Sequence, residues 1–312
     1  MFRFHQLLHA FLLIVLSGLC LSYLFIFPIL VLDGFPAREV RDIPWLSWIF
    51  LSVSFAIITP TLWALEHEAI HGLLFDHRFM NTVAGHFLGY LLGIPFHILR
   101  QGHLVHHRLN RSVLDRTEVY SLPAISLGSA CFFYYIRLCG GLYVGELLTN
   151  FLVWLPRSIQ KNLLQKWTSA HMDDWQANVA KPFLAAPSLW LARFDALINV
   201  SLLTISVLLY DPFIWLLIPG FMLRGFMISV FDNAYHYGTE LDNAMGSFNV
   251  KLKSPWDWWL LNGNFHASHH QRPDLPWWQL PSMHGRNDMS NGFRYLWRQF
   301  QGPIPENGLL RR

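Results

Sequence analysis

The strongest constraint on this chain is a set of four apolar stretches, each long enough to cross a lipid bilayer. A membrane-spanning helix needs roughly 20 apolar residues, because the helix must satisfy its own backbone hydrogen bonds inside the hydrocarbon layer. We therefore predict an all-α integral membrane protein with about four transmembrane helices. The stretches are approximately Phe11–Leu32, Trp45–Leu65, Ser188–Tyr210 and Phe213–Phe231.

Composition supports one membrane-embedded domain over residues 1–312. Only 14% of the residues are charged, whereas an average soluble domain has about 25%. No Ser/Gly-rich linker divides the chain, and the net charge of +3 is too small to indicate nucleic-acid binding. The first apolar stretch is too long for a cleaved signal peptide. Cys20, Cys131 and Cys139 lie in apolar segments, so we expect buried, unpaired thiols.

The distribution of Lys and Arg predicts the orientation in the membrane. Residues 33–44 contain Arg38 and Arg41 but also three acidic residues, and the Asp211-Pro212 turn contains no basic residue. The stretch 66–182 and the tail after residue 231 are rich in Lys and Arg. Under the positive-inside rule, both termini and the middle stretch lie in the cytoplasm. We expect a multi-pass protein of a bacterial inner membrane.

Two further apolar stretches are expected to lie at or partly within the membrane. Val83–Leu99 is short and rich in glycine, and a full crossing would place the histidines on its two sides on opposite membrane faces. We interpret it as re-entrant or interfacial. Ala124–Leu155 carries Arg137 and Glu146, and we interpret it as interfacial or half-inserted. A further hairpin of two spans there would preserve the same topology.

Histidines gather in short motifs that follow apolar stretches. Two histidines four residues apart lie on one face of a helix, one turn apart, which suits two ligands of one metal. This spacing occurs within each of three motifs, and one more histidine follows the fourth stretch. The nine candidate ligands are His67 and His71 in "HEAIH", His103, His106 and His107 in "HLVHH", His236 in "HYG", and His266, His269 and His270 in "HASHH".

The adjacent histidines in two motifs indicate two metal ions rather than one. Neighbouring residues on a helix point about 100° apart, so His106 and His107 suit two different metals. Nine imidazoles exceed the capacity of one metal and suit two metals with four or five nitrogens each. Imidazole suits iron, copper, zinc and nickel, and oxygen chemistry favours iron or copper among them. A structural zinc site would usually include cysteine.

The remaining histidines are not expected to bind metal. His5 and His9 also stand four residues apart, and we interpret them as an interfacial N-terminal pair whose replacement is nearly silent. The others lack a partner at ligand spacing and are interpreted as polar surface or supporting residues. They are His77, His86, His97, His171 and His284.

The motifs "HEAIH", "HLVHH" and "HASHH", in that order, resemble those of the membrane-bound fatty acid desaturases and their hydroxylase relatives. "HYG" and "PDLPWWQLP" strengthen the resemblance, which covers roughly residues 45–283. It implies spans below a cytosolic, histidine-rich cap that holds two iron ions, with the nine histidines as ligands. It also implies an acyl tunnel, molecular oxygen as oxidant and electrons from a separate reductant.

Supporting and substrate-binding residues follow from chemistry and position. Metal-bound histidines usually donate their second N–H to a neighbouring polar group, and the candidates are Glu68, Asp115, Glu118, Asp232 and Asn264. Arg224 falls within "FMLRGFM", where a charge is costly and usually faces the protein interior. It is a candidate to bind a carboxylate or pair with an acid. The candidate tunnel residues are Trp45, Trp48, Trp63, Phe221, Met222, Phe226 and Met227.

The expected partners are membrane lipids, a fatty acyl substrate and an electron donor. The acyl chain would be linked to a lipid, coenzyme A or acyl carrier protein. The chain has no room for a fused haem domain, so a ferredoxin- or rubredoxin-like protein would supply electrons. Basic residues would dock an acidic protein or anionic lipid headgroups. They include Lys161, Lys166, Lys251 and Lys253.

Alternative functions remain open from the sequence. The same metal site serves hydroxylases, carotenoid ketolases and decarboxylases that form a terminal alkene, because placement of the substrate decides the product. A metal transporter is a third class. A transporter would carry its ligands inside the spans, whereas here they cluster just beyond the spans.

Overall fold

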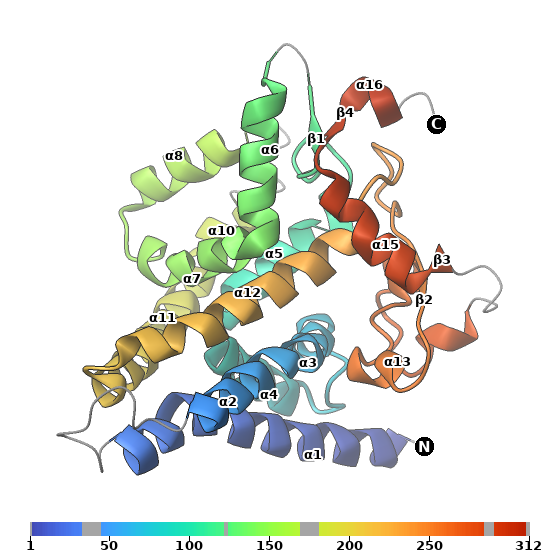
Figure 1. Cartoon of the computed structure of the whole chain (residues 1–312). Helices are drawn as coiled ribbons and strands as arrows, with labels where there is room; N and C mark the ends of the chain where they lie inside the picture. Colours follow the sequence, from blue (N-terminus) through green and yellow to red (C-terminus); the bar gives the residue numbers. More distant parts are fainter. Residues whose placement is uncertain (1, 33–44, 122–123, 169–180, 284–289, 310–312) are drawn as a thin grey trace.

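The computed structural model is a bundle of helices with four strands of two residues each (Figure 1). It describes residues 2–32, 45–121, 124–168, 181–283 and 290–309. The strands form two parallel pairs, β1 (Val119–Tyr120) with β4 (Ile304–Pro305) and β2 (Val250–Lys251) with β3 (Ser290–Asn291). The all-α prediction is therefore confirmed. The 33–44 loop of the topology prediction lies outside the described residues.

Among the described residues, five helical segments are long and apolar enough to cross a membrane, or six if the bent pair Arg78–Leu92 and Phe96–Leu109 is counted as one span, against about four predicted from the sequence. Four of them match the predicted stretches within a few residues at most ends, although the first begins earlier and the second continues through the first histidine motif. Many of their large apolar side chains are exposed, for example Ile14 (73%) and Phe50 (69%). Such surfaces are expected where a protein faces lipid. The five are Phe4–Ile26, Trp45–His71, Leu127–Leu152, Leu189–Tyr210 and Ile214–Ala234.

The four predicted spans are built from α1 to α3, α11 and α12. The first span is mostly α1 (Phe2–Leu21), followed by short π-helical segments at Ser22–Ile26 and Pro28–Leu32. In the second, α2 (Trp45–Ile57) continues into α3 (Thr59–His71), whose proline stands in the first turn, where its missing N–H costs no hydrogen bond. α11 (Ala186–Tyr210) is followed by the 3₁₀ turn Ile214–Leu216 and α12 (Leu217–Ala234).

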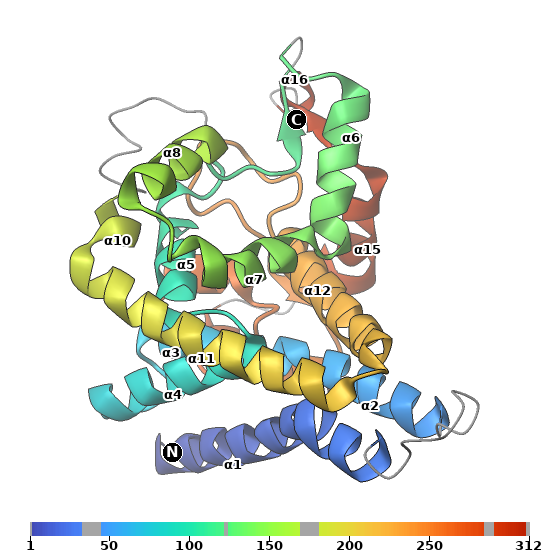
Figure 2. The same ribbon diagram turned by 90° about the vertical axis from the view of Figure 1, so that its left-hand side faces the viewer.

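The fifth candidate span is broken in the middle. α6 (Leu127–Ile136) meets α7 (Leu142–Leu152) through a π-helical segment, Arg137–Gly141, in which Gly140 has a φ of +113°. α6 stands at a steep angle to α1 and α12 in both views (Figures 1 and 2). Each half has 10 or 11 residues, about 15 Å of helix, so neither crosses a bilayer alone. A hairpin of two spans is therefore excluded.

The stretch interpreted as re-entrant or interfacial is a bent pair of helices. α4 (Arg78–Leu92) and α5 (Phe96–Leu109) meet at an angle of 98°. Gly93 ends α4 with a φ of +77°, and Pro95 precedes the first residue of α5. This bend turns α5 back, so that the second histidine motif faces the first.

Short elements complete the chain beyond these helices. α8 (Arg157–Thr168) and α10 (Lys181–Leu184) precede α11. After α12 come α13 (Trp256–Trp259), α14 (His266–Gln271), the 3₁₀ turn Leu280–Ser282, α15 (Gly292–Arg298), the 3₁₀ turn Gln299–Gln301 and α16 (Glu306–Leu309).

The main hydrophobic core joins the spans to the segment that follows α14. It includes Tyr23 from the first span, Phe55 and Leu62 from the second, and Trp277 from the C-terminal segment. Trp277 is only 2% exposed and anchors that segment against α1 and α3. As a result, the third histidine motif, on α14, is held against the ends of α3 and α5.

Candidate metal centre

The nine predicted ligand histidines come together in two groups. The first group, here called the five-histidine cluster, comprises His67, His71, His103, His107 and His269. The second, the four-histidine cluster, comprises His106, His236, His266 and His270. In each group the ring nitrogens that face inward lie within 4.8 Å of one another. No other group of three or more such residues occurs among the described ranges.

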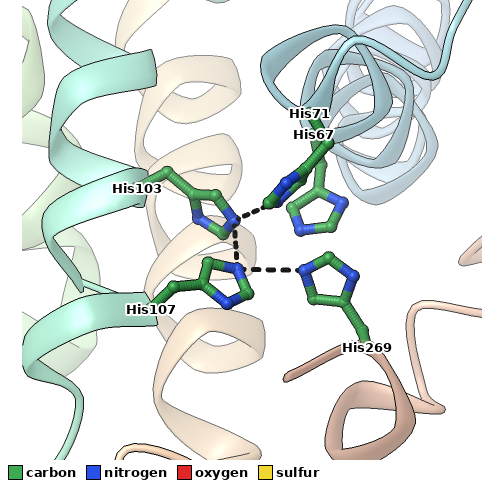
Figure 3. A group of neighbouring side chains, drawn as sticks. All are labelled: His67, His71, His103, His107 and His269. Carbon is green, nitrogen blue, oxygen red and sulfur yellow. Dashed lines mark hydrogen bonds between the residues drawn. The ribbon is translucent and has the colours of Figure 1, made fainter. Parts of the chain in front are cut away.

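The five-histidine cluster draws on three separate elements (Figure 3). α3 contributes two rings, α5 contributes two, and α14 contributes His269. The Nε2 atom of His103 lies 3.0 Å from Nε2 of His71 and 2.9 Å from Nε2 of His107. Nε2 of His269 lies 3.0 Å from Nε2 of His107. Figure 3 shows these rings pointing toward one another across the space between the helices.

The four-histidine cluster uses the remaining member of each adjacent pair. His106 comes from α5, His236 follows α12 directly, and α14 supplies His266 and His270. Nε2 of His266 lies 3.0 Å from Nε2 of His236 and 3.2 Å from Nε2 of His270. The His107 and His270 rings stack at 4.3 Å, so the two clusters are direct neighbours. The division that the sequence predicts for adjacent histidines is therefore present in the structure.

Three rings of the four-histidine cluster have a lowered pKa, whereas burial of the fourth, His106, is outweighed by attraction to Asp115, which raises its pKa. Burial, followed by repulsion from His270 and His236, lowers the pKa of His266 well below its ordinary value. Burial, followed by repulsion from His106, lowers the pKa of His236 to about 3. These rings are therefore neutral at physiological pH and keep a free lone pair. A neutral imidazole has one N–H, so several converging rings cannot satisfy one another by hydrogen bonds alone.

Two rings of the four-histidine cluster are oriented by hydrogen bonds on their outer nitrogens. Nδ1 of His236 donates to the carbonyl of Gly246 at 3.0 Å, because a carbonyl oxygen can only accept. Nδ1 of His106 lies 2.5 Å from Oδ2 of Asp115. Burial alone would raise the pKa of Asp115, but the neighbouring His106 outweighs burial and lowers it. Both rings thus direct Nε2 toward the cluster.

Only Asp115, among the five predicted supporting residues, has a hydrogen bond to a histidine of either cluster in the described structure. Glu68 accepts a long bond (3.4 Å) from the backbone N–H of Trp277. Asp232 pairs with Arg137 at 3.1 Å. The other two carry their bonds to groups outside the clusters: Glu118 to Arg111 (2.7 Å) and the N–H of Gly238 (3.0 Å), and Asn264 to the carbonyl of Val250 (2.8 Å) and to Asp257 (3.0 Å).

The predicted tunnel residues divide between the outer surface of the bundle and its interior. On the outer surface, Trp45 is 62% exposed, Met222 66% and Phe226 36%. Successive residues of α12 point in different directions, so a run of apolar side chains cannot all face inward. Phe221 and Arg224 line a cavity of about 70 Å³ between α12 and its neighbours. Three others are half-buried: Trp63, Met227 and Trp48, the last donating to the carbonyl of Leu216.

Arg224 is buried and bonded to protein groups. Its guanidinium donates to the carbonyl of Leu91 (2.7 Å) and, with longer contacts of 3.3 Å each, to Thr59 Oγ1 and Cys20 Sγ. Its central carbon lies 3.5 Å from the ring centroid of Phe55. No acidic partner occurs among the described residues. The interior position predicted for this charge is present, whereas a paired acid is not.

The histidines at the N-terminus, predicted to be an interfacial pair, are buried against the rest of the protein. His9 is 0% exposed, donates from Nδ1 to the carbonyl of Leu74 (2.8 Å) and accepts at Nε2 from Trp277 (2.9 Å). His5 stacks on Trp278 at 4.1 Å. The first helix thus packs against the "PWW" segment through contacts between residues that lie far apart in the sequence, so local patterns could not predict them.

The other residues predicted to lie at the surface differ in how exposed they are. His77 is exposed, whereas His86 lies 2.8 Å from the buried Asp195 and His97 is half-buried. Lys161, Lys251 and Lys253 are exposed. His171, His284 and the side chain of Lys166 lie outside the described structure.

The three cysteines differ from the prediction that all are buried. Cys20 is buried, Cys131 is half-buried and Cys139 is exposed. The prediction is wrong for Cys139 because this residue lies at the kink beside Gly140.

Residues that the sequence did not single out support the clusters. Asn110 and Arg111 directly follow the second motif and bond to the loop that holds His236. Asn249 accepts from the N–H of Ser268 (3.1 Å) and donates to its hydroxyl (3.0 Å), at the start of α14. The position of Asn110 and Arg111 shortly after "HLVHH" is a sequence feature that could have identified them as supporting residues. Nothing local distinguishes Asn249.

Comparison with known proteins agrees with this geometry. The sequence profile described as fatty acid desaturase matches residues 43–299. A Sorghum bicolor protein named "Probable fatty acid desaturase DES1" is 37% identical over 75 residues, or 23% of this chain and 19% of that protein. A Nicotiana tabacum protein named "Omega-3 fatty acid desaturase, endoplasmic reticulum" is 34% identical over 70 residues, or 22% of this chain and 18% of that protein. Each match therefore spans about a fifth of the relative's length.

Proposed function

The chain belongs to the fatty acid desaturase family, and we propose that it is an oxygen-dependent di-iron desaturase that introduces a double bond into a fatty acyl chain. The observation that carries this proposal is the division of nine histidines into two adjacent clusters of five and four. That arrangement supplies two metal sites in direct contact. A single structural metal would need only one of them.

The donor set of the two clusters fits iron. All nine predicted donors are imidazole nitrogens, which suit iron, and no cysteine belongs to either cluster. Five nitrogens leave one position of an octahedral ion free, and four nitrogens leave two. Free positions are what a catalytic metal needs and what a closed structural site lacks.

The chemistry requires a strong oxidant, because an acyl methylene has no acidic proton. Two bound iron ions would supply oxygen activation and removal of hydrogen from the acyl chain. The protein would hold one pair of methylenes beside the clusters and exclude water from them. The Nδ1 anchors at Asp115 and Gly246 would keep two of the ligand rings fixed during this chemistry.

The electron balance requires an external reductant. Desaturation takes two hydrogens from the acyl chain, while reduction of O₂ to two water molecules takes four electrons and four protons. The acyl chain supplies half of these. We propose that a ferredoxin- or rubredoxin-like protein delivers the other two electrons, with two protons from the medium. The exposed Lys161, Lys251 and Lys253 support an acidic partner.

We infer that the substrate is a fatty acyl chain linked to a lipid, coenzyme A or acyl carrier protein, which reaches the site from the membrane. We further infer that both termini and both clusters lie on the cytoplasmic side of a bacterial inner membrane, with the broken segment Leu127–Leu152 interfacial or half-inserted rather than crossing it. The concentration of Lys and Arg in residues 66–182 and after 231 supports this orientation.

The proposal is tested by expressing the full chain in a bacterial host that lacks the activity. Lipids and hydrocarbons are then profiled by mass spectrometry. A new double bond within acyl chains is the expected product. A hydroxylated chain, a ketocarotenoid or a terminal alkene would instead identify one of the related oxidations. The matched control is the His107→Ala/His269→Ala double variant, with its level in the membrane fraction measured in parallel.

Metal transport is distinguished by stoichiometry and oxygen use. We expect two iron ions per chain and oxygen consumption that depends on added substrate. Metal uptake into vesicles without oxygen consumption would contradict the desaturase proposal.

A further inference from the structure

The carbonyl of Gly246 is the most heavily used acceptor beside the four-histidine cluster. It accepts from Nδ1 of His236 (3.0 Å) and Nδ2 of Asn110 (3.1 Å), and Oγ1 of Thr239 lies 3.1 Å away but is closer to the carbonyl of His236 (2.8 Å). The two N–H donors match the two lone pairs of this carbonyl oxygen and fix its position. The orientation of the His236 ring therefore depends on groups that do not themselves face the cluster.

Asn110 connects this carbonyl to the second histidine motif. It directly follows α5, which ends at Leu109, and is only 2% exposed. Its side-chain amide donates to the carbonyls of Ala244 (2.9 Å) and Gly246 (3.1 Å). Because α5 carries His106, one amide fixes the distance between the elements that hold two ligands of the four-histidine cluster.

Arg111 reinforces the same connection. Its guanidinium pairs with Glu118 at 2.7 Å, with both side chains almost fully buried, and donates to the carbonyl of Thr239 at 3.0 Å. Its own carbonyl accepts from the N–H of Asp242 at 3.1 Å. Glu118 in turn accepts from the N–H of Gly238 at 3.0 Å. The loop after His236 is thus held by a charged pair as well as by Asn110.

The backbone of Arg111 is strained to make these contacts. Its φ is +66°, a left-handed conformation that is unfavourable for a non-glycine residue. The conformation lets its N–H reach the carbonyl of Asp115 (3.0 Å), the residue that anchors His106. A side chain on Gly246 would lie 2.8 Å from Cγ of Arg111, so loop and arginine pack directly together.

We propose that Asn110 and the Arg111–Glu118 pair are positioning residues that set the geometry of the four-histidine cluster and not of the five-histidine cluster. The inference rests on the proposed metal-binding function. Two of the four ligands in that cluster, His106 and His236, are held through this network. By contrast, within the described residues no hydrogen bond of Asn110, Arg111 or Glu118 reaches a ring of the five-histidine cluster.

The test measures metal binding by the full-length, metal-free protein in detergent. Cobalt(II) is titrated against a competing chelator while its visible absorption is recorded, and bound metal per chain is counted after dialysis. The variant is Asn110→Asp, which keeps the shape but replaces a donor by an acceptor facing two carbonyls. The matched control is Asn150→Asp, because Asn150 is also buried and donates to two carbonyls, those of Gly93 and Leu147.

The wild type is expected to hold two ions, and Asn110→Asp to hold one normally and the second about 10- to 100-fold more weakly. Asn150→Asp is expected to bind like the wild type. Glu118→Gln provides a second variant should Asn110→Asp fail to fold, with the same selective loss expected. Equal weakening of both ions, or unchanged binding in both variants, would overturn the inference. A wild-type chain that binds no cobalt would overturn the proposed function and this inference with it.

Discussion

The Nε2 atoms of His107 and His269 lie 3.0 Å apart, although the residues are separated by 162 positions in the chain. Their sequence neighbours, His106 and His270, face the other cluster. Each adjacent pair is thus split between two sites, as the rotation of about 100° per residue on a helix requires. The pairs at 106–107 and 269–270 therefore hold the two clusters side by side.

The first prediction follows from this division. His269→Ala should weaken the ion in the five-histidine cluster, and His270→Ala the ion in the four-histidine cluster, because each removes a ligand from one site only. We expect both variants to lose desaturation while still inserting into the membrane. Iron per chain and the electron paramagnetic resonance signal of the oxidised protein measure the effect. Identical spectra for the two variants would contradict the division into two sites.

The second prediction concerns the anchor of His106. Asp115→Asn keeps an oxygen that can accept from Nδ1 of His106 but removes the negative charge that strengthens this bond. We expect metal affinity of the four-histidine cluster to fall about 10-fold, which is the lower range for such outer contacts. Competition with a chelator measures the affinity. Asp274→Asn, at an exposed pair with Arg272, is the control and should bind as the wild type does.

The grouping of the nine predicted ligands could be read from the sequence because their signal is local. A spacing of four residues places two histidines on one helix face wherever the helix goes, and adjacency splits neighbouring histidines between clusters, as the structure has them. The spans were equally predictable, since the apolar run itself is the structural requirement. The kink at Gly140 was not, because a positive φ at one glycine leaves no mark on the composition of Leu127–Leu152.

The supporting residues were harder to predict because their partners are distant in the chain. Glu118 was expected to bond a ligand histidine, but it pairs with Arg111 and the N–H of Gly238. A carboxylate near a motif in sequence has several possible partners, and tertiary packing selects one. His9 shows the same limit, since its bond to Trp277 joins positions 268 residues apart.

The third prediction corrects the expectation that replacing His9 is silent. His9→Ala leaves the Trp277 N–H and the Leu74 carbonyl without their partner in a buried site. Each unpaired group is expected to cost about 1–3 kcal/mol. We expect a lower thermal midpoint in detergent, monitored by tryptophan fluorescence, with metal content per folded chain unchanged. His77→Ala, at an exposed position, is the control, and equal midpoints for the two variants would count against this role of His9.

The fourth prediction uses two glycines in membrane helices. A side chain at Gly220 would lie 2.2 Å from the hydroxyl of Tyr23, which donates to the carbonyls of Leu216 and Leu217. Gly220→Ala must displace that ring, and such overpacking typically costs about 1–3 kcal/mol. Gly18→Ala meets nothing within 4 Å and should be neutral or slightly stabilising. The measurement is the thermal midpoint of each variant and of the wild type in the same detergent. A Gly220→Ala midpoint at or above that of the wild type would contradict the close contact between Gly220 and Tyr23.

The last prediction separates two roles for Arg224. Its guanidinium is occupied by Leu91, Thr59 and Cys20, so Arg224→Gln should lower the thermal midpoint by removing bonds between α12 and three other helices. If this is its whole role, KM for the acyl substrate stays constant and kcat per folded chain changes little. A raised KM with an unchanged midpoint would instead assign Arg224 to binding a substrate headgroup through the cavity that it lines. Arg272→Gln, at an exposed site, controls for loss of a positive charge and should shift neither quantity.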